Sequence, residues 1–241
     1  MLISVMYHHV NSDRCSNNLE IFEQHLSYIQ KNFTTVLPGE RIDENSICLT
    51  FDDAYSDFYF LIYPLLKKYN LKALLAVPSN YILDYCDLEP TIRMGFEHND
   101  LFKNYTKGTF CTYTELLEMI GSGLIVIASH SCTHSNLIQK EINLEQELEH
   151  SKKTLESKLN VTVDSFVFPF GKYNKEILKE TKKYYKYAFR IGNAVQEDFS
   201  GINGVIYRID GDKLDTKSSI FEWKKILKYK FKAFTKKVTN G

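Results

Sequence analysis

The sequence predicts an α/β fold, a distorted (β/α)7-type barrel in a single domain, from three observations. Short apolar runs that suit buried strands alternate with amphipathic segments that suit helices. About seven such units follow one another in 241 residues, which fits one large domain. No internal repeat or low-complexity linker divides them. Apolar strands separated by amphipathic helices are typical of a parallel sheet covered by helices, so a closed barrel is expected and an open doubly wound sheet is the alternative.

The expected strands are the apolar runs 2–7, 46–51, 72–78, 123–129, 165–170, 187–191 and 204–209. Helical spacing of apolar residues predicts helices at 18–33, 53–70, 113–123, 144–159 and 174–185. Pro64 should kink the second of these helices or start a new segment within it. The irregular polar stretch 79–111 is expected to be an insertion over one end of the fold. The barrel is predicted to occupy 1–218, and 219–241 is predicted to be a C-terminal basic amphipathic helix or tail.

Composition and charge exclude some classes of protein. Apolar residues make up 44% of the chain, which is enough for a real core. Lys+Arg and Asp+Glu balance at 30 each, so no net charge attracts nucleic acid and no nucleic-acid partner is expected. Five scattered cysteines without a CxxC pair indicate reduced thiols. With an N-terminus unlike a signal peptide, they predict a cytoplasmic protein, either free or peripheral at the inner membrane face.

Titratable side chains stand at the ends of four predicted strands. They are, in chain order, His8 and His9, Asp52 and Asp53, His130 and His134, and Arg208 and Asp210. Because the carboxyl ends of parallel strands meet at one rim, these groups should lie together. Two imidazoles and one carboxylate form a three-ligand metal set that leaves positions for water and substrate. A second, adjacent carboxylate then stays free to act as a base.

Each of these groups also has a plainer structural explanation. A single histidine at a strand end is more often a hydrogen-bonding residue than a ligand, and an HxxxH pair alone is a weak signal. An Asp-Asp pair after a strand is commonly a helix N-cap. The combination favours a functional site, since packing does not require titratable groups at the ends of four strands.

Four motifs resemble those of the polysaccharide deacetylases, the NodB-homology group of carbohydrate esterase type. TFDDAYSDFY (50–59) resembles the first motif, SHSCTH (129–134) the second and FPFGKYN (168–174) the third. MYHHV (6–10) resembles the opening of the subgroup with an N-terminal Tyr-His motif, which acts on poly-N-acetylglucosamine and related glycans. The motifs follow the family's order and span most of the chain.

The resemblance implies a (β/α)7-type barrel that uses one divalent metal ion to remove an N-acyl group, usually acetyl, from an amino sugar or glycan. It makes Asp52 the general base that activates water. It makes Asp53, His130 and His134 the metal ligands. Zinc suits this ligand set best, and cobalt, nickel or iron are alternatives.

The chain departs from the family pattern at three points. Ala54 stands where glycine is usual, and Val167 stands where an arginine usually steadies the base. Arg208, or else Arg190, is expected to supply that cation from a neighbouring strand end. No histidine follows His150, so the late Leu-x-His that protonates the leaving amine in many members is absent.

The remaining assignments also follow from the resemblance. The N-terminal histidine is thought to act as the acid in the Tyr-His subgroup, so His8 is predicted to be the general acid, with His9 as the alternative. The residues expected to contact the substrate are Tyr55, Pro169, Phe170, Gly171 and His9. The substrate would be an amino sugar or glycan intermediate, and a lipid-linked or nucleotide-linked form would suit a cytoplasmic enzyme.

The C-terminal segment SIFEWKKILKYKFKAFTKK (219–237) has a different character. Apolar residues recur at helical spacing and lysines occupy the other faces. The favoured interpretation is a final helix that packs on the barrel and leaves a lysine face in water. The alternative is a helix that lies on an anionic membrane surface.

Three hypotheses for function stay open at this point. The first is a metal-dependent carbohydrate N-deacetylase. The second keeps the same chemistry but acts on another small amide, as a deformylase or deacylase. The third is a catalytically inactive barrel that only binds glycan.

Overall fold

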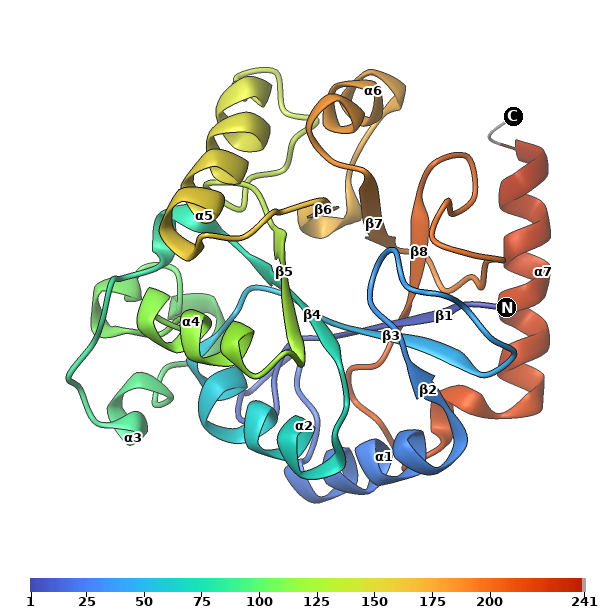
Figure 1. Ribbon diagram of the computed structural model, residues 1–241, viewed down its shortest axis with the longest axis horizontal. Helices are drawn as coiled ribbons and strands as arrows, with labels where there is room; N and C mark the ends of the chain where they lie inside the picture. The colour runs from blue at the N-terminus through green and yellow to red at the C-terminus, as the bar shows by residue number, and fades with distance from the viewer. Residues whose placement is uncertain (240–241) are drawn as a thin grey trace.

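Seven parallel strands close into a barrel in the computed structural model, which describes residues 1–239 (Figure 1). β1 (Ile3–Tyr7) pairs with β3 (Ser46–Phe51) on one side and with β8 (Ile206–Asp210) on the other, which completes the ring. Between β3 and β8 the ring contains β4 (Ala73–Val77), β5 (Ile125–Ser129), β6 (Ser165–Val167) and β7 (Tyr187–Ile191). The predicted barrel is confirmed, and the open sheet is excluded because the β1–β3 pairing leaves no open edge.

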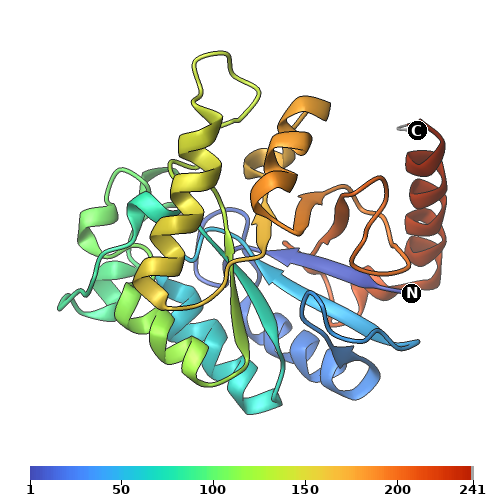
Figure 2. The same ribbon diagram turned by 45° about the horizontal axis from the view of Figure 1, so that its top comes forward.

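Helices surround the strands on the outside, as Figures 1 and 2 both show. They are α1 (Leu19–Asn32), α2 (Tyr63–Tyr69), α3 (Pro90–Arg93), α4 (Tyr113–Gly121), α5 (Ser151–Leu159), α6 (Lys175–Tyr184) and α7 (Trp223–Thr239). A π-helical turn, Phe58–Ile62, precedes α2, and Pro64 lies in the first turn of α2. Pro64 therefore lies at the start of the second of two consecutive helical segments, as expected. Within residues 1–239, none of these helices combines the length and the hydropathy that a bilayer crossing requires.

Successive side chains of each strand alternate between its two faces, and this alternation divides the core into two clusters. Outward-facing residues such as Leu49 on β3 join the helices in the larger cluster. The smaller cluster contains Cys48, Leu74, Val167 and Ile206, the residues of opposite parity, and fills the barrel interior. The side chains that face inward at the carboxyl ends of the strands therefore meet above the residues that fill the interior. This geometry positions the site.

Three local differences from the predicted elements have physical causes. β6 ends at Val167, and Pro169–Gly171 form a 3-10 turn because Pro169 has no N–H to extend the strand. A short strand β2 (Thr34–Thr35) pairs with the first residues of β3, and no sequence pattern predicted it. The predicted helix 53–70 begins later, since Asp53 and Ala54 adopt left-handed φ values of 70° and 53°.

The insertion 79–111 is anchored by one buried arginine. Arg93 is 2% exposed and donates to the carbonyl oxygens of Gly108 and Phe110. Its guanidinium also forms a two-pronged contact with Glu115, at 2.6 and 2.9 Å. Such charge-assisted pairs fix geometry strongly, so the insertion is held at the rim as an ordered wall.

The C-terminal segment forms α7, and residues 240–241 of the predicted stretch 219–241 lie outside the described residues. Tyr229 and Ala233 are buried in the larger core, so the helix does pack on the barrel. The expected packing face was wrong, however. Trp223 and Phe231, two of the apolar residues at helical spacing, are 68% and 67% exposed.

We expect Gly211→Ala to destabilise the barrel by about 1–3 kcal/mol. A Cβ at position 211 would lie 2.4 Å from Cε1 of Tyr7, in the tight junction between β8 and β1. Urea unfolding measures the change, and Gly121→Ala on α4 is the matched control because nothing lies within 4 Å of its added Cβ. Equal stabilities of the two variants would contradict this packing argument.

Candidate metal centre and active site

A cleft of about 400 Å³ opens at the C-terminal rim of the barrel, where the strand-end residues converge. Of the residues predicted from sequence, those in its wall are His8, Asp52, Asp53, Tyr55, His130, His134, Phe170, Gly171 and Arg208. Pro169 and His9 are buried and do not line the cleft. The insertion adds His98, Asn99 and Phe102, which no sequence pattern singled out.

Asp53, His130 and His134 converge on one point. Oδ1 of Asp53 lies 3.1 Å from Nε2 of His134 and 3.5 Å from Nε2 of His130. This oxygen is buried and accepts no hydrogen bond from the described residues. A buried carboxylate oxygen without a donor is costly, so its environment suits a cation.

The protonation of His130 also suits a ligand. Its Nδ1 lies 2.7 Å from the carbonyl oxygen of Val167, so Nδ1 carries the proton and Nε2 presents a lone pair to Asp53. Burial lowers the pKa of His130 to about 4, so the ring is neutral at physiological pH. The residues present therefore fit a divalent metal with two nitrogens and one oxygen, a donor set that zinc accepts well.

Glu147 holds the loop that carries both histidines, and sequence reasoning missed it. Its buried carboxylate accepts from the N–H groups of Cys132 and Thr133, at 3.0 and 2.9 Å, and from the Thr133 hydroxyl at 2.7 Å. His134 adopts a left-handed φ of 53°, which these contacts help to maintain. The Cys132 thiol donates to the Gln146 carbonyl oxygen and is not part of the ligand cluster.

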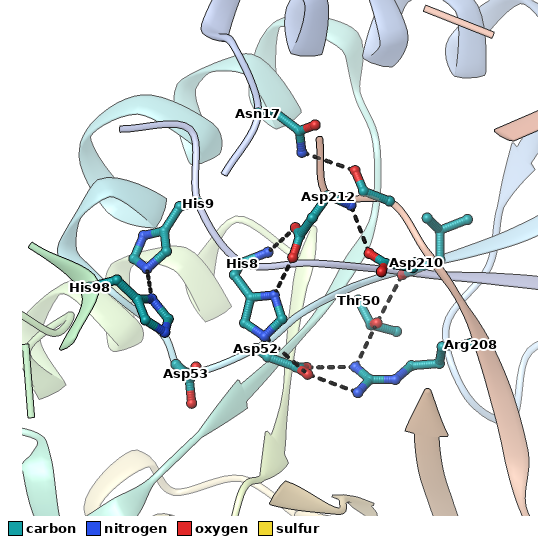
Figure 3. A network of polar contacts seen from close by, with 12 residues as sticks. His8, His9, Asn17, Thr50, Asp52, Asp53, His98, Arg208, Asp210 and Asp212 are labelled. Atoms are coloured by element: carbon teal, nitrogen blue, oxygen red, sulfur yellow. Dashed lines mark hydrogen bonds and ion pairs between the residues drawn. The ribbon is translucent and has the colours of Figure 1, made fainter. Parts of the chain in front are cut away.

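Asp52 directly precedes Asp53 in the sequence, but its carboxylate is paired with Arg208 (Figure 3). Arg208 donates from both terminal nitrogens to the two Asp52 oxygens, at 2.5 and 2.8 Å, and also to the Thr50 hydroxyl. Burial alone would raise the pKa of Asp52, but the charge and hydrogen bonds of Arg208 outweigh burial and hold that pKa well below its ordinary value. Asp52 is therefore ionised throughout the neutral range. Arg190, the alternative cation, instead lies over the rings of Tyr173 and Tyr207.

His8 faces Asp52 across the cleft and is held from behind by Asp212. Nδ1 of His8 lies 2.7 Å from Oδ2 of Asp212, while Nε2 lies 4.0 Å from Oδ2 of Asp52. Burial alone would lower the pKa of His8, but the hydrogen bond and charge of Asp212 raise it to about 10. His8 is therefore positively charged and presents an N–H to the cleft. Asp212 was missed because no local pattern links it to His8, which lies 204 positions away in the sequence.

His9 lies behind the cleft wall rather than in it. Its Nδ1 contacts Asp57 at 3.2 Å, its ring stacks on Tyr55 with centroids 4.0 Å apart, and its Nε2 lies 3.3 Å from Nδ1 of His98. Figure 3 shows His98 between His9 and Asp53. Burial lowers the pKa of His98, so this ring is neutral. Any influence of His9 on a substrate would thus pass through Tyr55 or His98.

The third motif supplies an aromatic wall. Phe170 is 61% exposed, has a left-handed φ of 56°, and places its ring 4.8 Å from that of His134. Gly171 has a φ of +62°, and a Cβ there would lie 2.9 Å from Cγ2 of Ile191. Pro169 is the buried first residue of this turn and does not line the cleft.

A parallel barrel with an Asp-His-His cluster and a separate ion-paired carboxylate at its carboxyl rim defines a candidate metallohydrolase. Comparison with known proteins identifies the family. The profile described as polysaccharide deacetylase matches residues 39–188, more than half of the chain, so the chain belongs to the polysaccharide deacetylase family.

Two relatives and one solved structure illustrate the similarity. The chain is 28% identical over 194 residues to YxkH of Bacillus subtilis, a protein named for this family, covering 74% of the chain and 60% of the relative. It is 24% identical over 173 residues to poly-β-1,6-N-acetyl-D-glucosamine N-deacetylase of Escherichia coli, covering 60% of the chain and 25% of that protein. The chain thus spans less than two thirds of these relatives. A polysaccharide deacetylase structure from Bacillus cereus superimposes with a TM-score of 0.74 at 22% identity, covering 93% of the chain and 68% of that structure, and supports the fold.

We expect Glu147→Ala to weaken zinc binding by about 10- to 100-fold, because the loop that aims both histidines loses its anchor. Isothermal titration of the metal-stripped protein with zinc measures the affinity. Glu149→Ala is the matched control, since Glu149 is on the same turn but pairs with Lys153 at the surface. Unchanged affinity in Glu147→Ala would show that the loop does not need this anchor.

Proposed function

We propose that the protein is a metal-dependent hydrolase that removes an N-acyl group, most simply acetyl, from an amino sugar. The observation that supports this proposal most strongly is that two adjacent carboxylates have different partners. Asp53 faces two imidazoles, while Asp52 is turned away and paired with Arg208. A site that only bound glycan would gain nothing from keeping a separate ionised carboxylate beside a metal set.

Asp52 is the proposed general base. It is ionised at all neutral pH values, and its oxygens are fixed by Arg208, so it is oriented to accept a proton from an attacking water. Its low pKa also makes it a weak base, which means that the water must be acidified. A divalent metal held by Asp53, His130 and His134 would supply that acidity and would polarise the substrate carbonyl.

His8 is the proposed general acid. An amine is a poor leaving group and must gain a proton as the C–N bond breaks. Asp212 keeps His8 protonated and fixes its ring, so that Nε2–H faces the cleft opposite Asp52. The water proton thus goes to Asp52 and the His8 proton goes to the departing nitrogen, which leaves acetate and a free amino sugar.

We infer the substrate class from the cleft and from the relatives. The cleft is open at the rim, with exposed Phe170 on one wall, so a sugar ring could pack against an aromatic face while polar groups act on its N-acyl substituent. The similar Escherichia coli protein is named for poly-β-1,6-N-acetyl-D-glucosamine. We propose an amino sugar within a glycan or its intermediate, either lipid-linked or nucleotide-linked. A cytoplasmic location would agree with the five free cysteines.

We expect Asp52→Asn to lower turnover by about 10²- to 10⁴-fold while the protein keeps its metal. Release of acetate from N-acetylglucosamine oligomers measures turnover, and mass spectrometry measures the metal. Asp87→Asn, at an exposed carboxylate, is the control. Release of formate from an N-formyl substrate, with no acetate from sugars, would support a deformylase instead. A metal-loaded wild type that binds glycan oligomers without hydrolysing any amide would indicate an inactive binding barrel.

We expect Asp212→Asn to move the alkaline limb of the kcat/KM profile to lower pH, by about 1–3 units. His8 must be protonated to act, so activity is lost as pH rises through its pKa. Asp212 raises that pKa, and its removal makes the loss begin earlier. Asp215→Asn, at an exposed carboxylate three residues further along, should leave the profile unchanged. An unshifted alkaline limb in Asp212→Asn would remove His8 from the role of acid.

A further inference from the structure

α7 carries an exposed apolar stripe that the barrel does not cover. Its members are between 55% and 68% exposed, and they are Trp223, Leu227, Phe231, Phe234 and Val238. Single exposed apolar residues are ordinary on protein surfaces, but five large ones in one row are not. Such a contiguous patch marks a surface that meets something apolar.

The stripe lies on the side of α7 that faces away from the protein. At about 100° per residue, its five members fall within an arc of about 80° on the helix surface. The buried residues Tyr229 and Ala233 lie on the opposite side, against the core. Figures 1 and 2 agree that α7 stands at the edge of the molecule, beside the strands rather than between other helices.

Lysines border the stripe on both sides. α7 contains seven lysines and no acidic residue, although acidic and basic residues balance in the whole chain. On the same helical projection, Lys224 and Lys228 lie along one edge of the stripe, and Lys230 and Lys237 lie along the other. All four are exposed, and Lys237 also pairs with Glu197. The outer face therefore presents an apolar centre between two positive rows.

We propose that this face of α7 binds the surface of an anionic lipid bilayer, with the helix axis in the membrane plane. An apolar, aromatic-rich centre would insert at the boundary between headgroups and acyl chains, with Trp223 suited to that interface. The two lysine rows would contact lipid phosphates on either side. The proposal concerns a surface outside the cleft and does not depend on the reaction proposed above.

Charge favours a bilayer over a second copy of this chain. In a two-fold dimer through the stripe, the lysine rows of one α7 would face those of the other, and no acid on the helix could offset the repulsion. An anionic bilayer supplies both an apolar phase and compensating phosphates. A complementary acidic protein is the other conceivable partner, and vesicle binding separates it from a lipid surface.

The test is co-sedimentation of the full chain with vesicles of phosphatidylcholine, alone or mixed with phosphatidylglycerol, at low and high salt. We expect binding to the anionic vesicles only, and loss of binding at high salt. Phe231→Gln with Phe234→Gln, and separately Lys224→Gln with Lys228→Gln and Lys230→Gln, should each weaken binding by about tenfold or more. Leu117→Gln, at a 46% exposed leucine on α4, is the control and should bind as wild type does.

Several outcomes would overturn the proposal. The first is absence of binding to anionic vesicles, and the second is binding that both sets of variants leave intact. The third is self-association that Phe231→Gln with Phe234→Gln abolishes and that added vesicles do not reduce. The last result would assign the stripe to a second copy. Circular dichroism and the thermal midpoint of each variant confirm folding, and all substituted side chains are exposed, so a loss of binding would not reflect unfolding.

Discussion

The buried ion pair between Arg208 and Asp52 is the interaction on which the rest of the site depends. Arg208 comes from β8 and Asp52 follows β3, so the pair forms only because β1 brings these two strands to either side of itself. Removing one partner from such a pair commonly costs about 3–5 kcal/mol, because the other charge is left buried alone. The pair therefore links closure of the barrel to the geometry of the rim. With Asp52 committed to Arg208, only Asp53 is left to face the two imidazoles.

Around this pair, several of the groups with a proposed chemical role are held by a second group. Val167 fixes the ring of His130, Asp212 fixes that of His8, and Glu147 fixes the backbone of the loop between His130 and His134. Preorganisation of this kind allows charge to be stabilised without rearrangement during a reaction. It also explains why left-handed backbone conformations gather here, at Asp53 and His134 among others. Their strain is offset by the buried contacts that hold them.

Sequence alone predicted much of the fold, because buried strands and amphipathic helices have distinct periods. It placed Asp52, Asp53, His130 and His134 at one rim, since the first three follow strands closely and His134 lies four residues after His130. It could not supply Asp212, which lies 204 positions from His8, because no local pattern indicates so distant a contact. His98 was hidden for a similar reason, inside an irregular insertion whose path depends on the buried Arg93. The sequence also could not show which face of α7 packs on the core. An apolar stripe shows that a helix is amphipathic, but it does not show which side of the helix meets the core.

The measurement that tests the central claim most directly is the metal content of the purified protein, by mass spectrometry, for wild type beside His134→Ala. We expect about one zinc or similar divalent ion per chain in the wild type, and its loss in the variant. Loss from the variant alone would tie the ion to the Asp53, His130 and His134 cluster. Absence of metal from both proteins, even after zinc is added back, would contradict the account and remove the basis for a hydrolytic site.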